Sequence, residues 1–278
     1  MAGRRSGGLD DPLDASLDVA RTPIGELRER LGDPARPRSP DALLGALRRD
    51  PRAGARELAE RWARRRAAHR DDLRRVRRLF AHRQALVRAG ARHVAGVDEA
   101  GMGPLAGPIV AGAVVLGERP RLPGLDDSKK LTAATRERLD GEIRAQAVAF
   151  AVAEVWPDEI ARLNVYHAGL EAMRRAVVAL GLAPDHVMVD ARTIPGIAAP
   201  QTALVHGDAE DGSIAAASVL AKVHRDALMS ELARRHPGYG FEHNRGYATA
   251  DHLAALRRLG PSPVHRPSFA PVSQLAFF

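Results

Sequence analysis

The sequence predicts an α/β domain with one mixed sheet flanked by helices, preceded by an N-terminal helical extension. From Val94 onward, short apolar segments typical of buried strands alternate with longer segments that have helical periodicity. Before that point the chain is rich in arginine and shows only helical patterns. No internal repeat interrupts this order, so the alternation after Val94 describes a single domain.

Length and composition limit the classes of protein to consider. The 278 residues can form one sizeable core with an appendage, or two small domains. Cysteine is absent, which excludes a disulfide framework, a thiolate metal site and a cysteine nucleophile. No apolar segment is long enough to span a membrane, and the N-terminus lacks the apolar region of a signal peptide. We expect a soluble, monomeric, cytoplasmic protein.

The first 92 residues fall into two expected segments. Residues 1–50 are rich in Pro, Gly, Asp and Arg, and we expect a loosely ordered N-terminal arm with helical patches at 24–31 and 40–47. Residues 51–92 predict a basic amphipathic helix, broken near His69, in which the apolar positions recur at three- and four-residue steps. Those positions are Leu58, Trp62, Leu73, Val76, Phe80 and Val87.

Positive charge is concentrated in this extension. The chain carries a net charge of +8, but residues 51–93 alone contain 14 arginines against 4 acidic residues. Residues 94–278 contain 19 basic and 21 acidic residues. Two compatible interpretations remain: the apolar stripe packs on the main domain, and the arginine face also follows the phosphates of a nucleic acid.

The main domain, residues 93–278, predicts five strands and four long helices. The strands are expected at residues 94–98, 109–116, 148–155, 186–190 and 202–206. The helices are expected at residues 132–145, 158–180, 213–235 and 249–259.

The first strand ends in two carboxylates followed by a glycine-rich loop. Asp98 and Glu99 follow a short apolar run, and Gly101, Gly103 and Gly107 come next. Adjacent carboxylates at the end of a buried strand are costly unless a cation or hydrogen bonds compensate them, although a solvated turn is the ordinary alternative. A dinucleotide loop is disfavoured because Pro104 and Gly107 break the G-x-G-x-x-G spacing.

Two further carboxylates occupy similar positions. Asp190 closes the predicted strand at 186–190, and Asp208 follows the next one. A solvated loop would explain each of them taken alone. If all four carboxylates converge, all-oxygen ligation favours Mg²⁺ or Mn²⁺ over Zn²⁺. Two such ions about 4 Å apart suit phosphodiester hydrolysis.

Ordered motifs along residues 93–270 resemble those of the bacterial ribonuclease HII family (type 2 ribonuclease H). The first match is Asp98-Glu99-Ala100-Gly101 followed by Gly103-Pro104-Leu105-Ala106-Gly107-Pro108. Further matches are Asp127-Ser128-Lys129-Lys130-Leu131, Val189-Asp190-Ala191, Gly207-Asp208, Ser213-Ile214-Ala215-Ala216-Ala217-Ser218, Ala221-Lys222-Val223, Arg225-Asp226, Pro237-Gly238-Tyr239-Gly240-Phe241, Gly246-Tyr247 and His265-Arg266-Pro267-Ser268-Phe269.

The resemblance implies a ribonuclease H-like fold and a metal-dependent endoribonuclease. Its expected partners are RNA·DNA hybrids and duplex DNA with embedded ribonucleotides, which a two-metal-ion reaction would cut to leave 3′-OH and 5′-phosphate ends. The cofactor would be Mn²⁺ or Mg²⁺. The resemblance places the catalytic, metal-binding carboxylates at Asp98, Glu99, Asp190 and Asp208.

Substrate contacts are also expected from the resemblance. Reading the ribose 2′-hydroxyl distinguishes RNA from DNA, and the backbone at Gly101, Met102 and Gly103 together with Tyr247 would do this. Lys129 and Lys222 are candidates for phosphate contacts or for orienting the carboxylates. Asp226 lies inside a helical pattern, where pairing with Arg225 or a helix partner is expected instead.

This chain departs from the family pattern at two positions. Met102 stands where the loop usually has Arg or Lys, and His206 stands where Lys usually precedes the Gly-Asp pair. Both changes remove positive charge, so substrate affinity and junction selectivity are expected to fall. Ribonuclease HIII, with its different glycine loop, a Glu as fourth carboxylate and a larger N-terminal sheet domain, fits less well. A non-catalytic hybrid-binding protein is the alternative of another class.

Overall fold

The structure is a computed structural model that describes residues 18–33 and 41–275. It divides into two compact units, Met1–Arg74 and Arg75–Phe278, which are described separately. This division differs from the boundaries at residues 50 and 92 that composition suggested.

The first unit is a small helical cluster. It comprises α1 (Ile24–Leu31), α2 (Asp41–Arg49) and the N-terminal part of α3 (Ala53–Leu79). Its core is built from leucines of all three helices and one tryptophan: Leu27, Leu31, Leu43, Leu44, Leu47, Leu58 and Trp62. Part of the segment expected to be loosely ordered is therefore packed, because its scattered leucines share one apolar core. Residues 1–17 and 34–40 of that expected arm lie outside the described residues.

The break in the basic helix lies elsewhere than expected. Helix α3 runs without interruption through His69, and the chain turns only at Phe80 before α4 (Ala81–Arg88). The predicted break near His69 is therefore wrong. Val76 and Phe80 are buried in the core of the second unit, whereas Leu73 is only half-buried. The end of α3 and α4 thus belong to the main domain.

The second unit contains a five-stranded mixed sheet, as predicted. Its strands are β1 (Val94–Ala100), β2 (Ile109–Leu116), β3 (Ala147–Val155), β4 (His186–Asp190) and β5 (Gln201–Leu204). Their order across the sheet is β3-β2-β1-β4-β5. The first three strands pair antiparallel, while β4 and β5 run parallel to β1.

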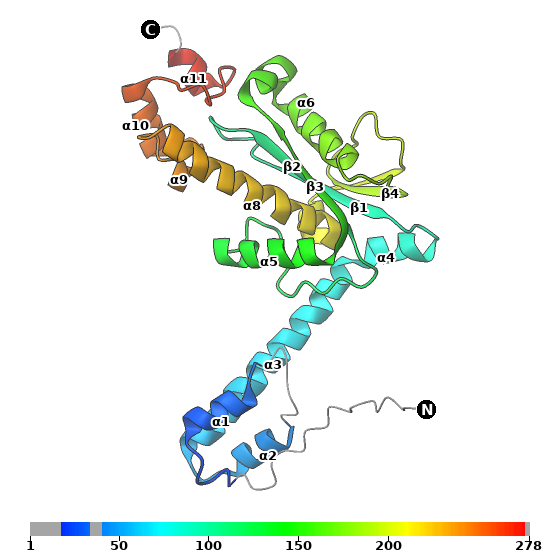
Figure 1. Cartoon of the computed structure of the whole chain (residues 1–278), viewed down its shortest axis with the longest axis vertical. Coiled ribbons are helices and arrows are strands. Elements are labelled where there is room, and N and C mark those ends of the chain that lie inside the picture. Colours follow the sequence, from blue (N-terminus) through cyan, green and yellow to red (C-terminus); the bar gives the residue numbers. More distant parts are fainter. Residues whose placement is uncertain (1–17, 34–40, 276–278) are drawn as a thin grey trace, which may run out of the picture. The chain divides into compact units, whose positions relative to one another are not determined.

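Helices cover both faces of this sheet (Figure 1). Helix α6 (Pro157–Val178) packs on one face, and α8 (Gly212–Arg235) with α5 (Ala133–Gln146) packs on the other. Strand β2 is buried along its whole length because its alternate side chains enter these two cores. This explains why β2 reads as a continuous apolar run rather than an alternating one.

Helix α8 approaches the centre of the sheet unusually closely. A Cβ atom at Gly96 of β1 would lie 2.1 Å from the backbone of Ser213, in the first turn of α8. Only glycine permits this approach. The contact brings α8 directly against the strand that carries Asp98.

Short helices complete the unit. Helix α7 (Gly207–Glu210) links β5 to α8, and α9 (Phe241–Asn244), α10 (Ala250–Leu259) and α11 (Ala270–Leu275) follow α8. The last three pack with the glycine-rich loop around Phe241, Leu256 and Val264. In the described part of the chain, no helix is both long and apolar enough to cross a membrane.

The junction around Phe80 generates a stability prediction. The Phe80 ring is 2% exposed and would collide with any side chain placed at Gly212, where α8 begins. Phe80→Ala should lower the free energy of unfolding by about 3–5 kcal/mol, because it leaves a cavity beneath α8. Urea denaturation measures this. Phe150→Ala is the control, since that ring is 39% exposed and its loss should cost much less. Equal losses would contradict the assignment of Phe80 to the core.

Candidate active site

The sheet brings two of the predicted carboxylates to neighbouring positions. Strands β1 and β4 are parallel neighbours, and Val97 lies opposite Val189. Asp98 and Asp190 are the next residues of these strands, so they lie at the same end of this pairing. Strand β1 itself does not end at Asp98 as predicted but continues to Ala100, because Asp98 to Ala100 still pair with β2. Strand β5 lies beside β4 and continues through His206 into α7, where Asp208 is the second residue.

Asp98 is the most buried of the four carboxylates, with 4% exposure. Burial raises its pKa well above the usual value, and the charges of Glu99 and Asp190 add to this shift. A hydrogen bond from Ser218 of α8 acts in the opposite direction. The Ser218 hydroxyl also lies 2.9 Å from the Ser128 hydroxyl. Asp98 is therefore bonded to one of two serine hydroxyls that are within hydrogen-bond distance of each other.

Glu99 and Asp190 have different partners. Burial raises the pKa of Glu99; the Arg192 charge lowers it and the Asp190 charge raises it. The Arg192 guanidinium lies 3.5 Å from a Glu99 carboxylate oxygen. Asp190 Oδ1 accepts a hydrogen bond of 2.7 Å from the Gly207 backbone N–H. That bond ties the end of β4 to the start of α7.

Asp208 is buried beside a lysine. Burial raises its pKa, although the Lys129 charge lowers it and the charges of Asp127 and Asp190 raise it. The Lys129 ammonium lies 3.3 Å from Asp208 Oδ2, while the lysine side chain is 79% exposed. Lys129 therefore sits between solvent and the carboxylates. Burial lowers the pKa of Lys129, but the negative charges around it outweigh this effect and raise the pKa overall. Those charges belong to Asp208, Asp127 and Asp98.

The four carboxylates influence one another electrostatically, but they do not form a ready-made metal cage. Among residues 18–33 and 41–275, no three His, Asp or Glu side chains lie close enough to hold one ion as placed. The donors are all oxygen, and three of the four have pKa values raised by burial and by like charges. Such a set is short of positive charge, which fits a hard divalent cation.

The glycine-rich loop lies against two buried arginines. Gly101 has a φ of +93°, and a Cβ atom there would lie 2.1 Å from Arg225 Nε. Both the left-handed backbone and the close contact require glycine. The Arg266 guanidinium donates to the carbonyl oxygens of Gly101, Met102 and Gly107. By contrast, a Cβ atom at Gly103 would meet nothing within 4 Å, so that position is open.

The Met102 side chain packs toward α6 instead of reaching solvent as a cation would. Its sulfur lies against Gly169, where a Cβ atom would be only 2.9 Å away. The same Cβ atom would lie 3.5 Å from an Arg192 nitrogen. Arg192 thus places a guanidinium near Met102 and beside Glu99. Sequence reasoning missed it, and its position two residues after Asp190 was the available signal.

Tyr247 lies near the glycine-rich loop because the preceding residue, Gly246, is hydrogen-bonded to that loop. The Gly246 carbonyl accepts a hydrogen bond of 2.8 Å from the Leu105 N–H. The Tyr247 ring is 44% exposed, and the Arg225 guanidinium lies 5.9 Å from its centroid. Tyr247 therefore places an accessible aromatic ring next to the glycine-rich loop. Arg225 contacts both this ring and the loop.

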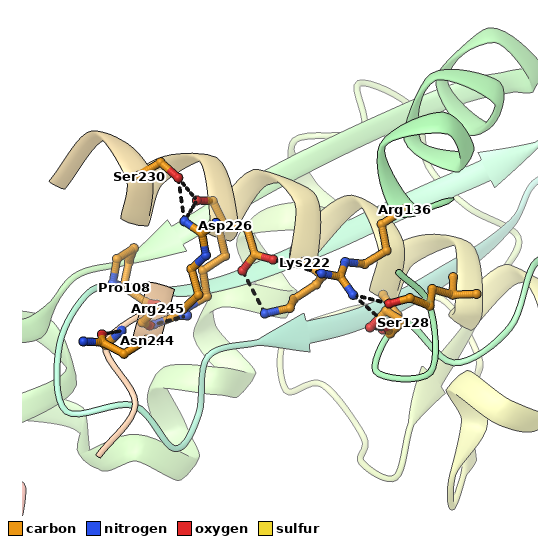
Figure 2. Close-up of polar contacts among 12 residues, drawn as sticks. Pro108, Ser128, Arg136, Lys222, Asp226, Ser230, Asn244 and Arg245 are labelled. Carbon is orange, nitrogen blue, oxygen red and sulfur yellow. Dashed lines mark hydrogen bonds and ion pairs between the residues drawn. The ribbon is translucent and has the colours of Figure 1, made fainter. Parts of the chain in front are cut away.

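Lys222 and Asp226 belong to a separate polar network on α8 (Figure 2). The Lys222 ammonium lies 2.8 Å from Asp226 Oδ1, and Arg136 of α5 lies 3.4 Å from Asp226 Oδ2. Asp226 therefore pairs with a helix partner, one of the two expectations for it. Arg225 is not its partner and instead donates to the carbonyl oxygens of Ala106, Pro108 and Arg245.

Comparison with known proteins identifies the family. The family model for ribonuclease HII matches residues 95–272. The chain belongs to the ribonuclease HII family. This confirms the resemblance, and the chain is accordingly a metal-dependent endoribonuclease of RNA·DNA hybrids. The carboxylates, the glycine-rich loop and Tyr247 all lie within the matched ribonuclease HII region.

Relatives cover almost the whole chain. It is 52% identical to the ribonuclease HII of Anaeromyxobacter sp. strain Fw109-5, over 92% of this chain and 81% of that one. It is 51% identical to the ribonuclease HII of Myxococcus xanthus, over 95% of this chain and 89% of that one. Both alignments are longer than the main domain alone, so they include part of the N-terminal unit.

Solved structures confirm the fold. Ribonuclease H2 from Pyrococcus horikoshii matches with a TM-score of 0.56 and 28% identity, over 66% of this chain and 97% of that one. Ribonuclease HII from Archaeoglobus fulgidus, solved in complex with PCNA, matches with a TM-score of 0.57 and 26% identity, over 66% and 96%. A ribonuclease HIII named Bst-RNase HIII, solved with Mn²⁺, shares the fold at 20% identity and a TM-score of 0.52, over 69% and 72%.

The raised carboxylate pKa values predict how stability depends on pH. A carboxyl group whose pKa is higher in the folded than in the unfolded state favours folding when protonated, and this contribution is lost as pH rises through the folded pKa. Asp98→Asn should therefore stabilise the metal-free protein at neutral pH, by on the order of 1 kcal/mol, and much less under acidic conditions. Thermal unfolding in chelator at several pH values measures the difference.

Asp185 provides the control with the opposite sign. Hydrogen bonds from the backbone N–H groups of His93 and Arg92 lower its pKa. Asp185→Asn should therefore destabilise the protein, and the loss should shrink as pH falls and the wild-type carboxylate is protonated. An Asp98→Asn variant that is less stable than wild type at neutral pH would contradict the electrostatic description of the site.

Proposed function

We propose that Asp98, Glu99, Asp190 and Asp208 form the catalytic centre of this ribonuclease HII. The enzyme would cut the RNA strand of hybrids and also single ribonucleotides embedded in duplex DNA, leaving 3′-OH and 5′-phosphate ends. The observation that carries the proposal is the position of Asp98 and Asp190 at the same end of the pairing between β1 and β4, where the Asp190 charge helps to raise the pKa values of Asp98 and Glu99. A buried negative cluster of this kind needs cations to be stable.

We propose Mg²⁺ or Mn²⁺ as the cofactor, held by these four carboxylates. The oxygen-only donor set supports either ion, and the related Bst-RNase HIII has been solved with Mn²⁺. When bound, two divalent ions supply an activated water and stabilise the charge that develops on the phosphate and the leaving oxygen.

The protein's own residues orient the carboxylates. The Gly207 N–H holds Asp190, the Ser218 hydroxyl holds Asp98, and the Lys129 ammonium holds Asp208. Lys129 is mostly exposed, so it can also reach a substrate phosphate. Lys222 already has a partner in Asp226, which favours a supporting role over a phosphate contact.

The glycine-rich loop and Tyr247 would read the ribose. Free space at Gly103 and the fixed backbone at Gly101 let a sugar approach the loop closely. The half-exposed Tyr247 ring can pack against the adjoining sugar, with its hydroxyl available for a hydrogen bond. A non-catalytic hybrid-binding protein is not favoured, since all four carboxylates are present. The monomeric state and the cytoplasmic location stay predictions.

Removing a single carboxylate should abolish cleavage. Asp98→Asn and Asp190→Asn should each lower the rate on a DNA duplex with one ribonucleotide by about 10³-fold or more, because stabilisation worth several kcal/mol is lost. Initial rates in Mg²⁺ and in Mn²⁺ measure this. Asp226→Asn is the matched control and should retain substantial activity. Full activity in either active-site variant would refute the assignment.

Tyr247 should matter through both its ring and its hydroxyl. Tyr247→Phe keeps the ring and loses one hydrogen bond, so kcat/KM on a single-ribonucleotide duplex should fall about 10-fold. Tyr247→Ala loses the stacking surface as well, so its kcat/KM should fall further. Phe150→Ala, which removes a partly exposed aromatic ring from β3, is the control. If Tyr247→Ala cuts the substrate as well as wild type, Tyr247 has no part in reading it.

A further inference from the structure

The segment 264–266 pairs with the glycine-rich loop like a short strand. The Gly107 N–H donates to the Val264 carbonyl at 2.8 Å, and the Arg266 N–H donates to the Leu105 carbonyl at 2.8 Å. Between these bonds, Ala106 and His265 form an antiparallel bridge. The loop after β1 is therefore fixed by residues from the far end of the chain.

The side chain of Arg266 extends this contact to the start of the loop. It is fully buried, and its guanidinium donates to the carbonyl oxygens of Gly101, Met102 and Gly107 at 2.6, 2.9 and 3.0 Å. Within the described chain it forms no ion pair. A buried guanidinium without a carboxylate is costly. The carbonyl groups of this loop compensate it, together with the Phe269 ring, whose centroid lies 5.1 Å from the guanidinium carbon.

A chain of hydrogen bonds connects His265 to Tyr247 by way of His252. The N–H and hydroxyl of Ser262 approach His265 Nδ1 at 2.9 and 2.8 Å, which makes this nitrogen an acceptor. His265 Nε2 must then carry the proton and donate to His252 Nε2, 3.1 Å away. His252 Nδ1 in turn donates to the Tyr247 carbonyl at 2.8 Å. Only one arrangement of protons satisfies the whole chain of bonds.

These two sets of bonds end on the two elements proposed to read the ribose. We propose that His252, His265 and Arg266 are positioning residues that fix Tyr247 and the backbone at residues 101–103 relative to each other, so that both engage the same ribose. The inference deepens the proposed function and rests on it. We call the three residues the ribose clamp.

The surroundings argue against a purely structural role. The two histidines are buried among aromatic and aliphatic side chains, with the rings of Tyr239 and Phe241 within 5.6 Å of His265. Apolar residues would fill this space without the cost of burying three polar side chains. Apolar side chains could not hold specific carbonyl groups of the loop and of Tyr247, as Arg266 and His252 do.

Hydrogen exchange tests the clamp without reference to activity. In the free protein, His252→Leu and Arg266→Lys should speed amide exchange of Leu105 and Gly107 by at least about 10-fold, because loop opening becomes easier. Val272→Ala is the matched control, since Val272 is buried in the same apolar cluster and its N–H bonds to the Phe269 carbonyl and not to the loop. Unchanged exchange in both clamp variants, or an equal rise in the control, would overturn the proposal.

A double-mutant cycle tests the link to substrate reading. His252→Leu should lower kcat/KM on a single-ribonucleotide duplex by about 10- to 100-fold, with cleavage of a long hybrid less affected. His252→Asn, which keeps a donor for the Tyr247 carbonyl, should recover much of the loss. In a Tyr247→Ala background, His252→Leu should cost little more, because the two residues act through one contact.

The outcomes separate the clamp from the function on which it rests. Additive losses in the cycle, or a loss in Val272→Ala as large as in His252→Leu, would overturn the link to ribose reading. A wild-type protein that does not cut the ribonucleotide duplex would refute the proposed function instead, and the exchange measurement would still decide whether the clamp holds the loop.

Discussion

The pairing of β1 with β4 is the constraint on which the rest of the site depends. It places Asp98 beside Asp190 at one end of the sheet, where burial and like charge raise the pKa values of Asp98 and Glu99. This electrostatic cost is local, since the neighbouring strand β2 is buried along its whole length among apolar side chains. Close packing of α8 at Gly96 then supplies Ser218 beneath Asp98. The fold thus spends stability on a cluster that suits cations.

Three residues next to the site have an uncommon backbone conformation. Ala191, His206 and Arg245 have positive φ angles, although none of them is glycine. They lie next to Asp190, two residues before Asp208 and two residues before Tyr247. Non-glycine residues adopt this conformation only where surrounding contacts enforce it, and it often accompanies function. The Gly207 N–H bond to Asp190 and the Arg245 carbonyl bond to Arg225 are such contacts.

The glycine-rich loop depends on positive charge placed behind it. Arg225 and Arg266 are both fully buried, and together they donate to carbonyl groups from Gly101 to Pro108. Burial, together with the charge of the neighbouring Arg225, lowers the pKa of Arg266 to about 9. Met102 leaves the loop itself without a cation, but Arg192 stands nearby beside Glu99. Charge removed at one position is thus partly supplied from another element.

The sequence by itself determined the order of strands and helices after Val94, the position of Asp190 at the end of its strand, and the family, because periodicity and motifs are local properties. It placed the end of the first strand at Asp98, whereas β1 continues to Ala100 because its last residues still pair with β2. It could not determine the packing of the N-terminal leucines, the turn at Phe80, or the partners of Arg192, Arg225 and Arg266. A leucine pattern does not say whether another helix will share its core, and a lone arginine has no spacing that reveals its acceptor. Contacts such as those from Arg266 to Gly101, across more than 160 residues, exist only after the chain has folded.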